Sequence, residues 1–359
     1  MNVVLVAPLP PPYGGISNWT QMVASFFSEN NSLCVSVDVI NTAPKARAVD
    51  GRSLASRFFG GAKSIFSAKK QLKVLMQDKE VDVVHITTSG SLALLRDYVL
   101  LKACKKMRVA SVLHIRFGRV PEVLESGGLE KRLLLMAAKQ ASAVLVLDSR
   151  TNQALSLYGI KTDIIPNPVS ISETLPIFDK DKNSIVFLGW VVKSKGIEEL
   201  LEAWTYTQEY GVGKSATLKI AGPCKASYLK YLTENYDLNS VCFLGELEHA
   251  DAWNLLNKSE ILVLPSYTEG FPNVVVEAMA SGCAVVATDV GAIADILQGG
   301  CGILVKREPH AIASAIIDLL SDDAKRSSMA VRGQKKAREE YKLQNVANRY
   351  INYWRRISV

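Results

Sequence analysis

Short apolar runs alternate with longer amphipathic segments through the first half of the chain. Continuous apolar runs of this length are typical of parallel strands buried on both faces, whereas apolar residues three and four positions apart indicate helices. The predicted strands are 3–7, 34–40, 83–87, 110–115 and 143–147. The predicted helices are 16–29, a basic tract ending near Gln77, 92–106 and 129–140. This order predicts a Rossmann-like α/β domain.

A second series of strands and helices begins at Ile185, after the polar, proline-interrupted segment 170–182. Its later strands are predicted at 218–221, 241–244, 261–264, 284–287 and 302–305. Residues 341–357 are aromatic and basic with helical spacing. Because 359 residues suit two α/β domains better than one, we expect domains at 1–169 and 170–340, followed by a terminal helix within 341–359.

Composition narrows the class of protein. Hydrophobic residues make up 48% of the chain, yet no apolar run approaches the roughly 20 residues that a membrane span requires. The start, MNVVLVAPLPPPYGG, lacks a basic segment before its apolar residues, so it is interpreted as a first strand and not a signal peptide. We therefore expect a cytoplasmic protein. Its six cysteines have no C-x-x-C spacing, which predicts buried free thiols and argues against zinc or disulfides.

Charge is distributed unevenly along the sequence. Residues 1–168 hold 21 basic and 12 acidic side chains, a net charge of +9. Residues 169–340 hold 17 and 23, a net charge of −6, and 341–359 add four basic side chains. A basic first domain predicts an anionic substrate or surface on that side, with nucleic acid and an anionic membrane as the two candidates.

The richest chemistry lies in PSYTEGFPNVVVEAMASGCAVVAT, residues 265–288, between two predicted strands. Gly270 allows a sharp turn after Glu269, and Pro272 or Asn273 is the predicted first position of a helix. The free N–H groups at that helix start favour a phosphate. Glu269 on the turn, and Glu277 about one turn into the helix, are placed to accept hydrogen bonds from sugar and ribose hydroxyls.

This segment, with its E-x7-E spacing inside EGFPNVVVEAMASG, resembles the signature of glycosyltransferase family 4. The resemblance implies a GT-B fold, with two Rossmann-like domains facing across a cleft and a C-terminal helix, 341–359, that crosses back to the first domain. It implies an acceptor-binding first domain and a nucleotide-sugar-binding second domain. Glu269 and the backbone of Gly270, Phe271, Pro272 and Asn273 would then hold the donor sugar and phosphate, and Glu277 the ribose.

Two further segments fit this resemblance. In PPPYGGIS, Gly14 and Gly15 follow the first strand and match the family's glycine loop, although glycine in such a turn is also ordinary turn chemistry. In IVFLGWVVKSKGI, Lys195 resembles the lysine that pairs with the donor diphosphate, and such a cation stabilises the leaving group. The alternative for Lys195 is a solvated lysine at a helix start. The family's arginine after the strand glycine is replaced here by Trp190.

The cation missing at Trp190 has three candidate replacements. Lys193 lies in the same loop, and Arg116 and Arg119 lie in HIRFGRVPE of the first domain, where they are placed near the acceptor or the diphosphate. His114 ends the preceding strand, and by resemblance it lies near the donor sugar. His85, at another strand end, is interpreted as a packed or hydrogen-bonded residue.

Two segments carry competing interpretations. Asp179-Lys180-Asp181 has the D-x-D spacing that binds divalent ions in another class of glycosyltransferase, but it lies among lysines in the predicted linker. We interpret it as a solvated charge cluster and expect no metal and no other cofactor. The basic amphipathic segment 52–79 is interpreted equally as a surface helix and as a contact with anionic lipid.

The resemblance therefore implies a retaining glycosyltransferase that uses a nucleotide-sugar donor, which we expect to be a UDP- or GDP-sugar. A polyprenyl-diphosphate-linked saccharide of surface polysaccharide assembly is the expected acceptor, at the inner face of the plasma membrane, with no nucleic acid partner. One alternative is a non-catalytic sugar-nucleotide-binding protein, for which Trp190 is the support. The other is a nicotinamide-dependent oxidoreductase, because Asp38 follows Gly15 at a spacing like that of a dinucleotide fingerprint, although G-x-G-x-x-G is lacking.

Overall fold

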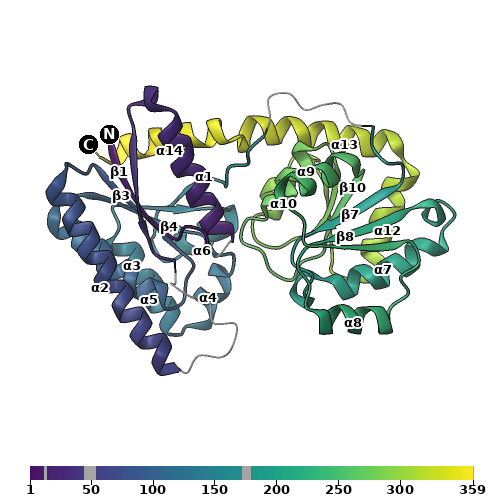
Figure 1. Cartoon of the computed structure of the whole chain (residues 1–359), viewed down its shortest axis with the longest axis horizontal. Helices are drawn as coiled ribbons and strands as arrows, with labels where there is room; N and C mark the ends of the chain where they lie inside the picture. Colours follow the sequence, from purple (N-terminus) through teal and green to yellow (C-terminus); the bar gives the residue numbers. More distant parts are fainter. Residues whose placement is uncertain (12–13, 44–53, 172–178, 359) are drawn as a thin grey trace. The chain divides into compact units, whose positions relative to one another are not determined.

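The computed structural model describes residues 1–11, 14–43, 54–171 and 179–358 (Figure 1). The chain forms two compact units, Met1–Pro168 with Leu343–Val359, and Val169–Lys342. The predicted domain limits, 169/170 and 340/341, lie within two residues of these. No helix in the described ranges is long and apolar enough to cross a membrane.

The first unit is built on a six-stranded parallel sheet with the order β2-β1-β3-β4-β5-β6. Its strands are β1 (Asn2–Ala7), β2 (Ser36–Asn41), β3 (Val83–Thr88), β4 (Ala110–Ile115), β5 (Ala143–Val146) and β6 (Asp163–Ile164). Its helices are α1 (Gly15–Glu29), α2 (Leu54–Asp78), α3 (Ala93–Met107), α4 (Val120–Ser126), α5 (Leu129–Gln140), α6 (Ser149–Ser156) and α14 (Leu343–Ile357). The predicted Rossmann-like alternation is confirmed.

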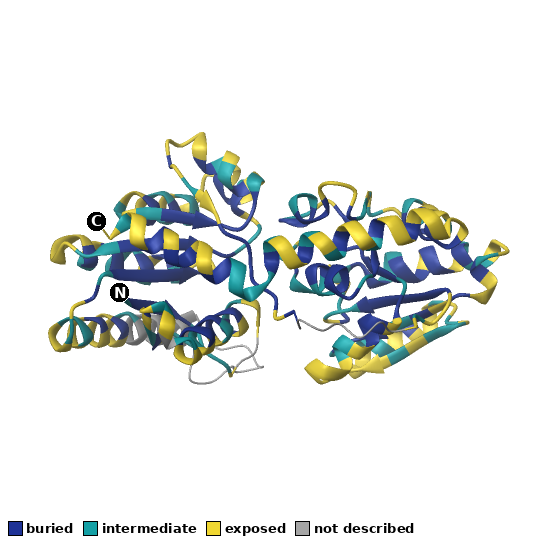
Figure 2. Ribbon diagram, turned by 90° about the horizontal axis from the view of Figure 1, so that it is seen from above, coloured by how far each residue is buried: buried dark blue, intermediate teal, exposed yellow. Residues whose placement is uncertain are grey.

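Side chains of β1 show how this sheet buries both faces. Val3 and Leu5 pack with α1 and α14, whereas Val4 and Val6 pack with α2, α3 and α5 on the opposite face. Successive residues of a strand point to opposite sides, so a continuous apolar run fills two cores at once. Figure 2 shows these strands buried while the outer sides of the helices are exposed.

The second unit repeats the plan with the strand order β12-β11-β10-β7-β8-β9. Its strands are β7 (Ser184–Leu188), β8 (Thr217–Ala221), β9 (Val241–Gly245), β10 (Ile261–Leu264), β11 (Ala284–Thr288) and β12 (Ile303–Val305). Its helices are α7 (Ile197–Glu209), α8 (Ala226–Asn235), α9 (His249–Lys258), α10 (Asn273–Ala280), α11 (Ile293–Leu297), α12 (Pro309–Ser321) and α13 (Asp323–Lys336). The strands are parallel, so their carboxyl ends share one edge.

The terminal helix begins two residues later than predicted. Residues Ala337–Tyr341 form a π-helical turn of the second unit. The centroids of the Tyr341 and Phe271 rings are 5.8 Å apart. The chain then returns to the first unit as α14, where Tyr350 and Trp354 are fully buried. The expectation that the last helix belongs with the first domain is met by this division.

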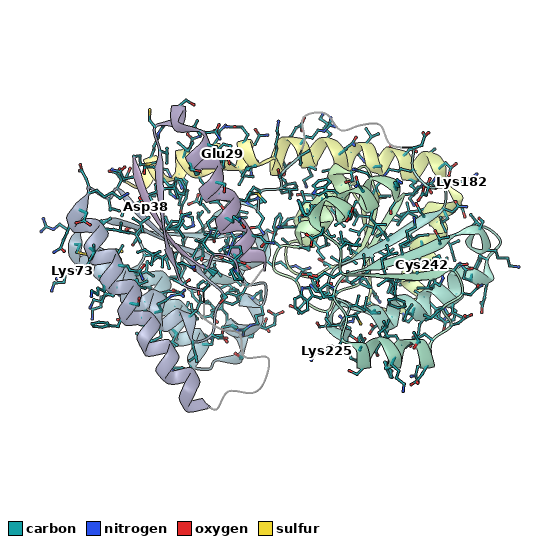
Figure 3. The ribbon with its side chains drawn as sticks, viewed as in Figure 1. Glu29, Asp38, Lys73, Lys182, Lys225 and Cys242 are labelled. Carbon is teal, nitrogen blue, oxygen red and sulfur yellow. The ribbon has the colours of Figure 1, made fainter. Side chains whose placement is uncertain are left out.

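Two predictions about side chains are wrong in part. All six cysteines are free, but Cys34 and Cys242 are exposed and only Cys104, Cys283 and Cys301 are buried. Cys242 is labelled in Figure 3. Lys180 is not a solvated charge, because its ammonium donates to the carbonyl oxygens of Ser259 at 2.6 Å and Ser281 at 3.0 Å. The chain around it is thus attached to the second unit. Residues 172–178 of the predicted linker lie outside the described residues.

Candidate functional site

The strands β7 and β10 are neighbours in the second sheet, and this brings two loops of distant sequence together. The Lys195 ammonium lies 2.6 Å from Oε1 of Glu269, and the Ser266 hydroxyl donates to the same oxygen at 2.7 Å. The Glu269 side chain is 10% exposed and that of Lys195 26%. One oxygen of Glu269 thus has two donors, which orients the carboxylate at the carboxyl edge of the sheet.

The loop that carries Glu269 turns directly into α10. Asn273, one of the two predicted starts, is the first helical residue, and Pro272, the other, is the N-cap. The carbonyl of Gly270 accepts a hydrogen bond from the backbone N–H of Ala292 at 3.0 Å. The Phe271 side chain packs against the hydrophobic core of the second unit. These two contacts hold the loop in place. The first N–H groups of α10, which have no partner within the helix, lie at the same edge of the sheet as Glu269.

A glycine from the next loop supports this one. Gly291, after β11, has a φ of +55°, and a Cβ atom there would lie 2.3 Å from the carbonyl oxygen of Glu269 and 2.6 Å from that of Gly270. Only glycine allows the two backbones to approach so closely. Gly196 has the same role beneath Lys195, where a Cβ atom would lie 2.0 Å from the carbonyl oxygen of Pro265. The sequence interpretation did not include either contact.

Glu277 lies on the second turn of α10 and is only partly exposed. Burial raises the pKa of its carboxyl to about 7. No other cause contributes to that shift, so this acid lacks the compensation that Lys195 gives Glu269. A partly buried carboxylate is stabilised by hydrogen-bond donors, which the hydroxyls of a ribose would supply.

The remaining predicted residues of this edge are at the surface. Trp190 is 57% exposed, and the Lys193 ammonium is 3.2 Å from the Glu198 carboxylate. Sequence reasoning missed Arg307, which follows β12 and stacks at 3.5 Å over the ring of Tyr267. The Tyr267 hydroxyl in turn donates to Glu199. The two basic residues that follow the strand ILV, Lys306 and Arg307, were the available signal for this cation.

In the first unit, Gly14 and Gly15 lie at the start of α1 and are exposed. A Cβ atom at Gly15 would meet nothing within 4 Å, and at Gly14 only the Ser17 hydroxyl at 3.9 Å. Packing therefore does not require glycine at either position. Residues 12 and 13 of the predicted loop lie outside the described residues.

The predicted side chains of β4 and the following loop differ sharply in environment. His114 is fully buried within the first unit, 3.0 Å from His85, and Arg116 is 7% exposed. Arg119 is instead a surface residue whose guanidinium holds both oxygens of Glu130, at 2.5 and 2.8 Å. This pairing weakens Arg119 as a replacement for the missing cation, because its charge is already compensated. His85 is packed and hydrogen-bonded, as interpreted from the sequence.

No group of three or more His, Cys, Asp or Glu side chains suitable for a metal ion occurs among the residues that the structure describes. Asp181 is exposed and pairs with Lys219 at 2.8 Å. Asp38, the acid of the dinucleotide alternative, pairs with Lys79. At the edge of the second sheet, Lys195 and Glu269 are in direct contact, and both belong to the glycosyltransferase prediction.

Residues 175–336 match the family model described as glycosyl transferases group 1, which covers most of the second unit. The resemblance to family 4 is thereby confirmed for this part of the chain. A capsular polysaccharide biosynthesis glycosyltransferase, CapM, of Staphylococcus aureus is 28% identical over 170 residues, 46% of this chain and 43% of its own. A D-inositol 3-phosphate glycosyltransferase of Corynebacterium urealyticum is 31% identical over 180 residues, 48% and 42%. The matches span just under half of the relatives' lengths.

Solved structures resemble the whole chain. A sucrose-phosphate synthase from Thermosynechococcus elongatus has a TM-score of 0.76 at 18% identity, covering 99% of this chain and 98% of its own. The Anabaena protein HepE, solved in complex with UDP, has a TM-score of 0.69 at 19% identity, with 98% of both chains covered. At these identities the likeness concerns the fold. The chain has the two-domain α/β fold of GT-B glycosyltransferases.

Proposed function

We propose that this protein is a retaining glycosyltransferase that uses a nucleotide-sugar donor. The observation that carries the proposal is the convergence of Lys195, Glu269 and the start of α10 at the carboxyl edge of the second sheet. Ligands of open parallel sheets bind at this edge. The family match over residues 175–336 supports the reaction class. The structures of HepE in complex with UDP and with UDP-glucose support the donor class.

In this proposal different residues of the second unit bind different parts of the donor. The first N–H groups of α10 and the ammonium of Lys195 bind the diphosphate, Glu269 accepts hydrogen bonds from the sugar, and Glu277 accepts them from the ribose. Lys193 and Arg307 are the candidates for a second cation. The Lys195 ammonium has three N–H donors, so in this proposal one keeps its contact with Glu269 while another binds the phosphate.

The proposed reaction transfers the sugar without a protein nucleophile. The bond from the anomeric carbon to the diphosphate oxygen breaks, and a bond to the acceptor hydroxyl oxygen forms on the same face. The hydroxyl proton passes to an oxygen of the departing diphosphate. Lys195 stabilises the charge that develops on that diphosphate, an effect that commonly contributes a large share of catalysis.

A lipid-diphosphate-linked saccharide is the proposed acceptor, bound by the basic first unit, and the capsular relative supports surface polysaccharide as the product class. On α2, Phe66 and Val74 are exposed, as are Lys69, Lys70 and Lys73. Of these, Lys73 is labelled in Figure 3. Apolar and basic side chains together favour peripheral contact with an anionic membrane at the cytoplasmic face. Flotation with anionic liposomes tests this contact, and a protein that remains unbound would remove it from the proposal.

Thermal-shift measurements with UDP-, GDP- and ADP-sugars test the donor site. We expect a shift of several degrees with one class of donor, lost in Glu277→Ala. Glu234→Ala is the matched control, because Glu234 is an exposed acid on α8 of the same unit. If no donor shifts the melting temperature, the proposal fails.

The non-catalytic alternative is favoured by one observation, the exposed Trp190 where the family has an arginine. Donor hydrolysis in the absence of an acceptor separates the two, since a protein that only binds the donor releases no sugar. Thermal-shift titration with nicotinamide cofactors tests the oxidoreductase alternative.

A further inference from the structure

The first sheet has an open edge at β2. This strand is the first in the sheet order, and no other strand of the described residues pairs with its outer side. The N–H groups of Ser36 and Thr42 donate to carbonyl oxygens at the two ends of β1, and the register between the strands is unbroken. Val37 and Val39 alternate with the residues that face β1, so their N–H and C=O groups point toward the open edge. These backbone groups can pair with a further strand.

A groove of about 550 Å³ lies between this edge and the helix α2. Its strand side includes Asp38, Val39 and Ile40. Its helix side includes Lys70 and the apolar side chains of the turn that follows, Val74 and Leu75. Extended peptides bind at open sheet edges by adding a strand, and pockets beside the edge receive alternate side chains. The groove has the position that such a pocket requires.

A second cavity, of about 400 Å³, adjoins the same strand on the opposite face of the sheet. It is lined in part by Phe27 of α1 and by Val35 and Val37. These three side chains belong to the core between the sheet and α14, whereas Ile40 and Leu75 belong to the core under α2. The side chains of a strand alternate between the two faces of its sheet. A strand added beside β2 would therefore find space on both faces.

The helix α2 has two exposed sides with different surroundings. Lys70 and Val74 are one helical turn apart and line the groove. Phe66, Lys69 and Lys73 are exposed but do not line it. The groove is thus distinct from most of the surface proposed for membrane contact, and Lys70 and Val74 lie at the boundary between the two.

The charges around the groove define the kind of peptide that fits. Asp38 is compensated, because it pairs with Lys79. Lys70 is exposed and has no acidic partner within the described ranges. Asp78 is the only acid in the α2 sequence, and it is the last residue of the helix and does not line the groove. Apolar side chains beside one uncompensated cation favour an extended segment that carries apolar side chains and a carboxylate.

We propose that β2 and α2 bind an extended acidic segment of a partner protein, which joins the first sheet as an additional strand. The backbone of this segment pairs with Val37 and Val39, its apolar side chains contact Ile40 and Val74, and its carboxylate pairs with Lys70. The inference goes beyond the proposed function, because the groove belongs to the first unit and the proposed donor site to the second.

Hydrogen exchange measured by NMR tests strand addition at single amides. The probe is the capped peptide Val-Thr-Glu-Thr-Val-Thr, which places Val, Glu and Val on one side and Thr on the other. We expect saturable protection of the Val37 and Val39 amides. Phe243 is the matched control, because its N–H points to the open edge of β9 in the second sheet. Protection of all three amides would mean that the peptide adds to any open edge, and protection of none would mean that β2 accepts no strand. Either result overturns the proposal.

An exchange of charges tests the acidic character of the partner. The same peptide with Lys in place of Glu should bind about fivefold more weakly or worse. In Lys70→Glu the preference between the two peptides should reverse. Lys139→Glu changes the net charge equally at an exposed lysine of α5, so the original preference should persist there. An unchanged preference in Lys70→Glu would overturn the pairing of Lys70 with an acidic partner.

Val39→Pro tests the pairing of the backbone. This variant removes an N–H that points away from β1, so β1 and β2 should stay paired while peptide binding is lost. Undiminished binding would contradict strand addition. A dimer of the unmodified protein that dissociates in Val39→Pro, measured by light scattering, would assign the edge to a second copy of this chain. Liposome flotation that is reduced in Lys70→Glu, without binding of either peptide, would assign the lysine to the membrane. Both results overturn the proposal.

The donor-dependent thermal shift separates this inference from the proposed function. It should persist in Val39→Pro and Lys70→Glu, since neither residue belongs to the second unit. Peptide binding by a protein without any donor-dependent shift would support the groove while contradicting the transferase proposal. A donor-dependent shift in a protein that binds neither peptide would leave the transferase proposal intact and overturn the groove.

Discussion

The ammonium of Lys195 lies 2.6 Å from the carboxylate of Glu269, although the two residues are 74 positions apart. The pair joins the loop after β7 to the loop after β10. It places a cation and an oriented carboxylate side by side at the proposed donor site. Substitution of either residue is therefore expected to affect both, because the remaining side chain loses its partner.

Lys195→Ala is expected to lower kcat by about 10²–10³-fold, since it removes the charge proposed to stabilise the departing diphosphate. The turnover of a nucleotide sugar under saturating donor measures this effect. Lys230→Ala, at an exposed surface pair with Glu234, is the control and should retain full activity. Equal activities of the two variants would contradict the role of Lys195.

Glu277 predicts a pH dependence of stability for the unliganded protein. Its pKa is about 7 in the folded state against 4.5 when unperturbed. Below about pH 4.5 the group is protonated in both states, and as pH rises toward 7 the unfolded state ionises first. Stability is therefore lost over this window, by about 1 to 3 kcal/mol.

Urea unfolding of Glu277→Gln at pH 5 and pH 8 measures the effect. The variant should lose less stability between the two pH values than the unmodified protein, because its amide does not titrate. A bound nucleotide should also diminish the difference by donating hydroxyl groups to the ionised carboxylate. The same pH dependence in both proteins would show that burial does not raise this pKa.

Gly291→Ala is expected to destabilise the donor loop. The new Cβ atom would lie 2.3 Å from the carbonyl oxygen of Glu269, and its φ of +55° is also unfavourable for alanine. Gly299→Ala is matched, because it has a φ of +86° but nothing within 4 Å of the Cβ position. Thermal unfolding should show a loss of about 1 kcal/mol for Gly299→Ala and clearly more for Gly291→Ala. Similar losses would mean that the close approach is relieved without cost.

Arg119→Ala should leave the KM for the donor unchanged, because both oxygens of Glu130 already compensate the guanidinium. Arg116→Ala should raise it or lower kcat, since Arg116 has no such partner among the described residues. Steady-state kinetics with a varied donor compare the two. A large effect of Arg119→Ala alone would reverse this assignment of the two arginines.

Turnover is expected to be independent of divalent metal ions. The diphosphate charge is proposed to be neutralised by Lys195 and by the N–H groups at the start of α10, so a bridging ion is not required. Activity measured with and without a chelator tests this. Loss of activity in the chelator, restored by Mg²⁺, would require an ion at the diphosphate.

Much of the local structure was predictable from the sequence. Apolar spacing predicted the limits of β4, α5 and β10, and the turn residues predicted that α10 begins at Pro272 or Asn273. These signals depend on neighbours within a few positions, so they are readable before the tertiary partners of a segment are known. The positions of Glu269 and Glu277 in the E-x7-E segment were similarly predictable, because both residues belong to one loop and the helix that follows it.

The partners of the functional side chains were decided by tertiary structure. The strand order places β7 beside β10, and this alone brings Lys195 to Glu269. Arg116 and Arg119 are three positions apart in sequence, yet one is buried without an acid and the other is paired at the surface. His85 meets Trp354 across 269 positions. The sequence by itself determined which elements form and which residue types they carry. The pairing of those residues depended on the packing of distant elements, which no local pattern encodes.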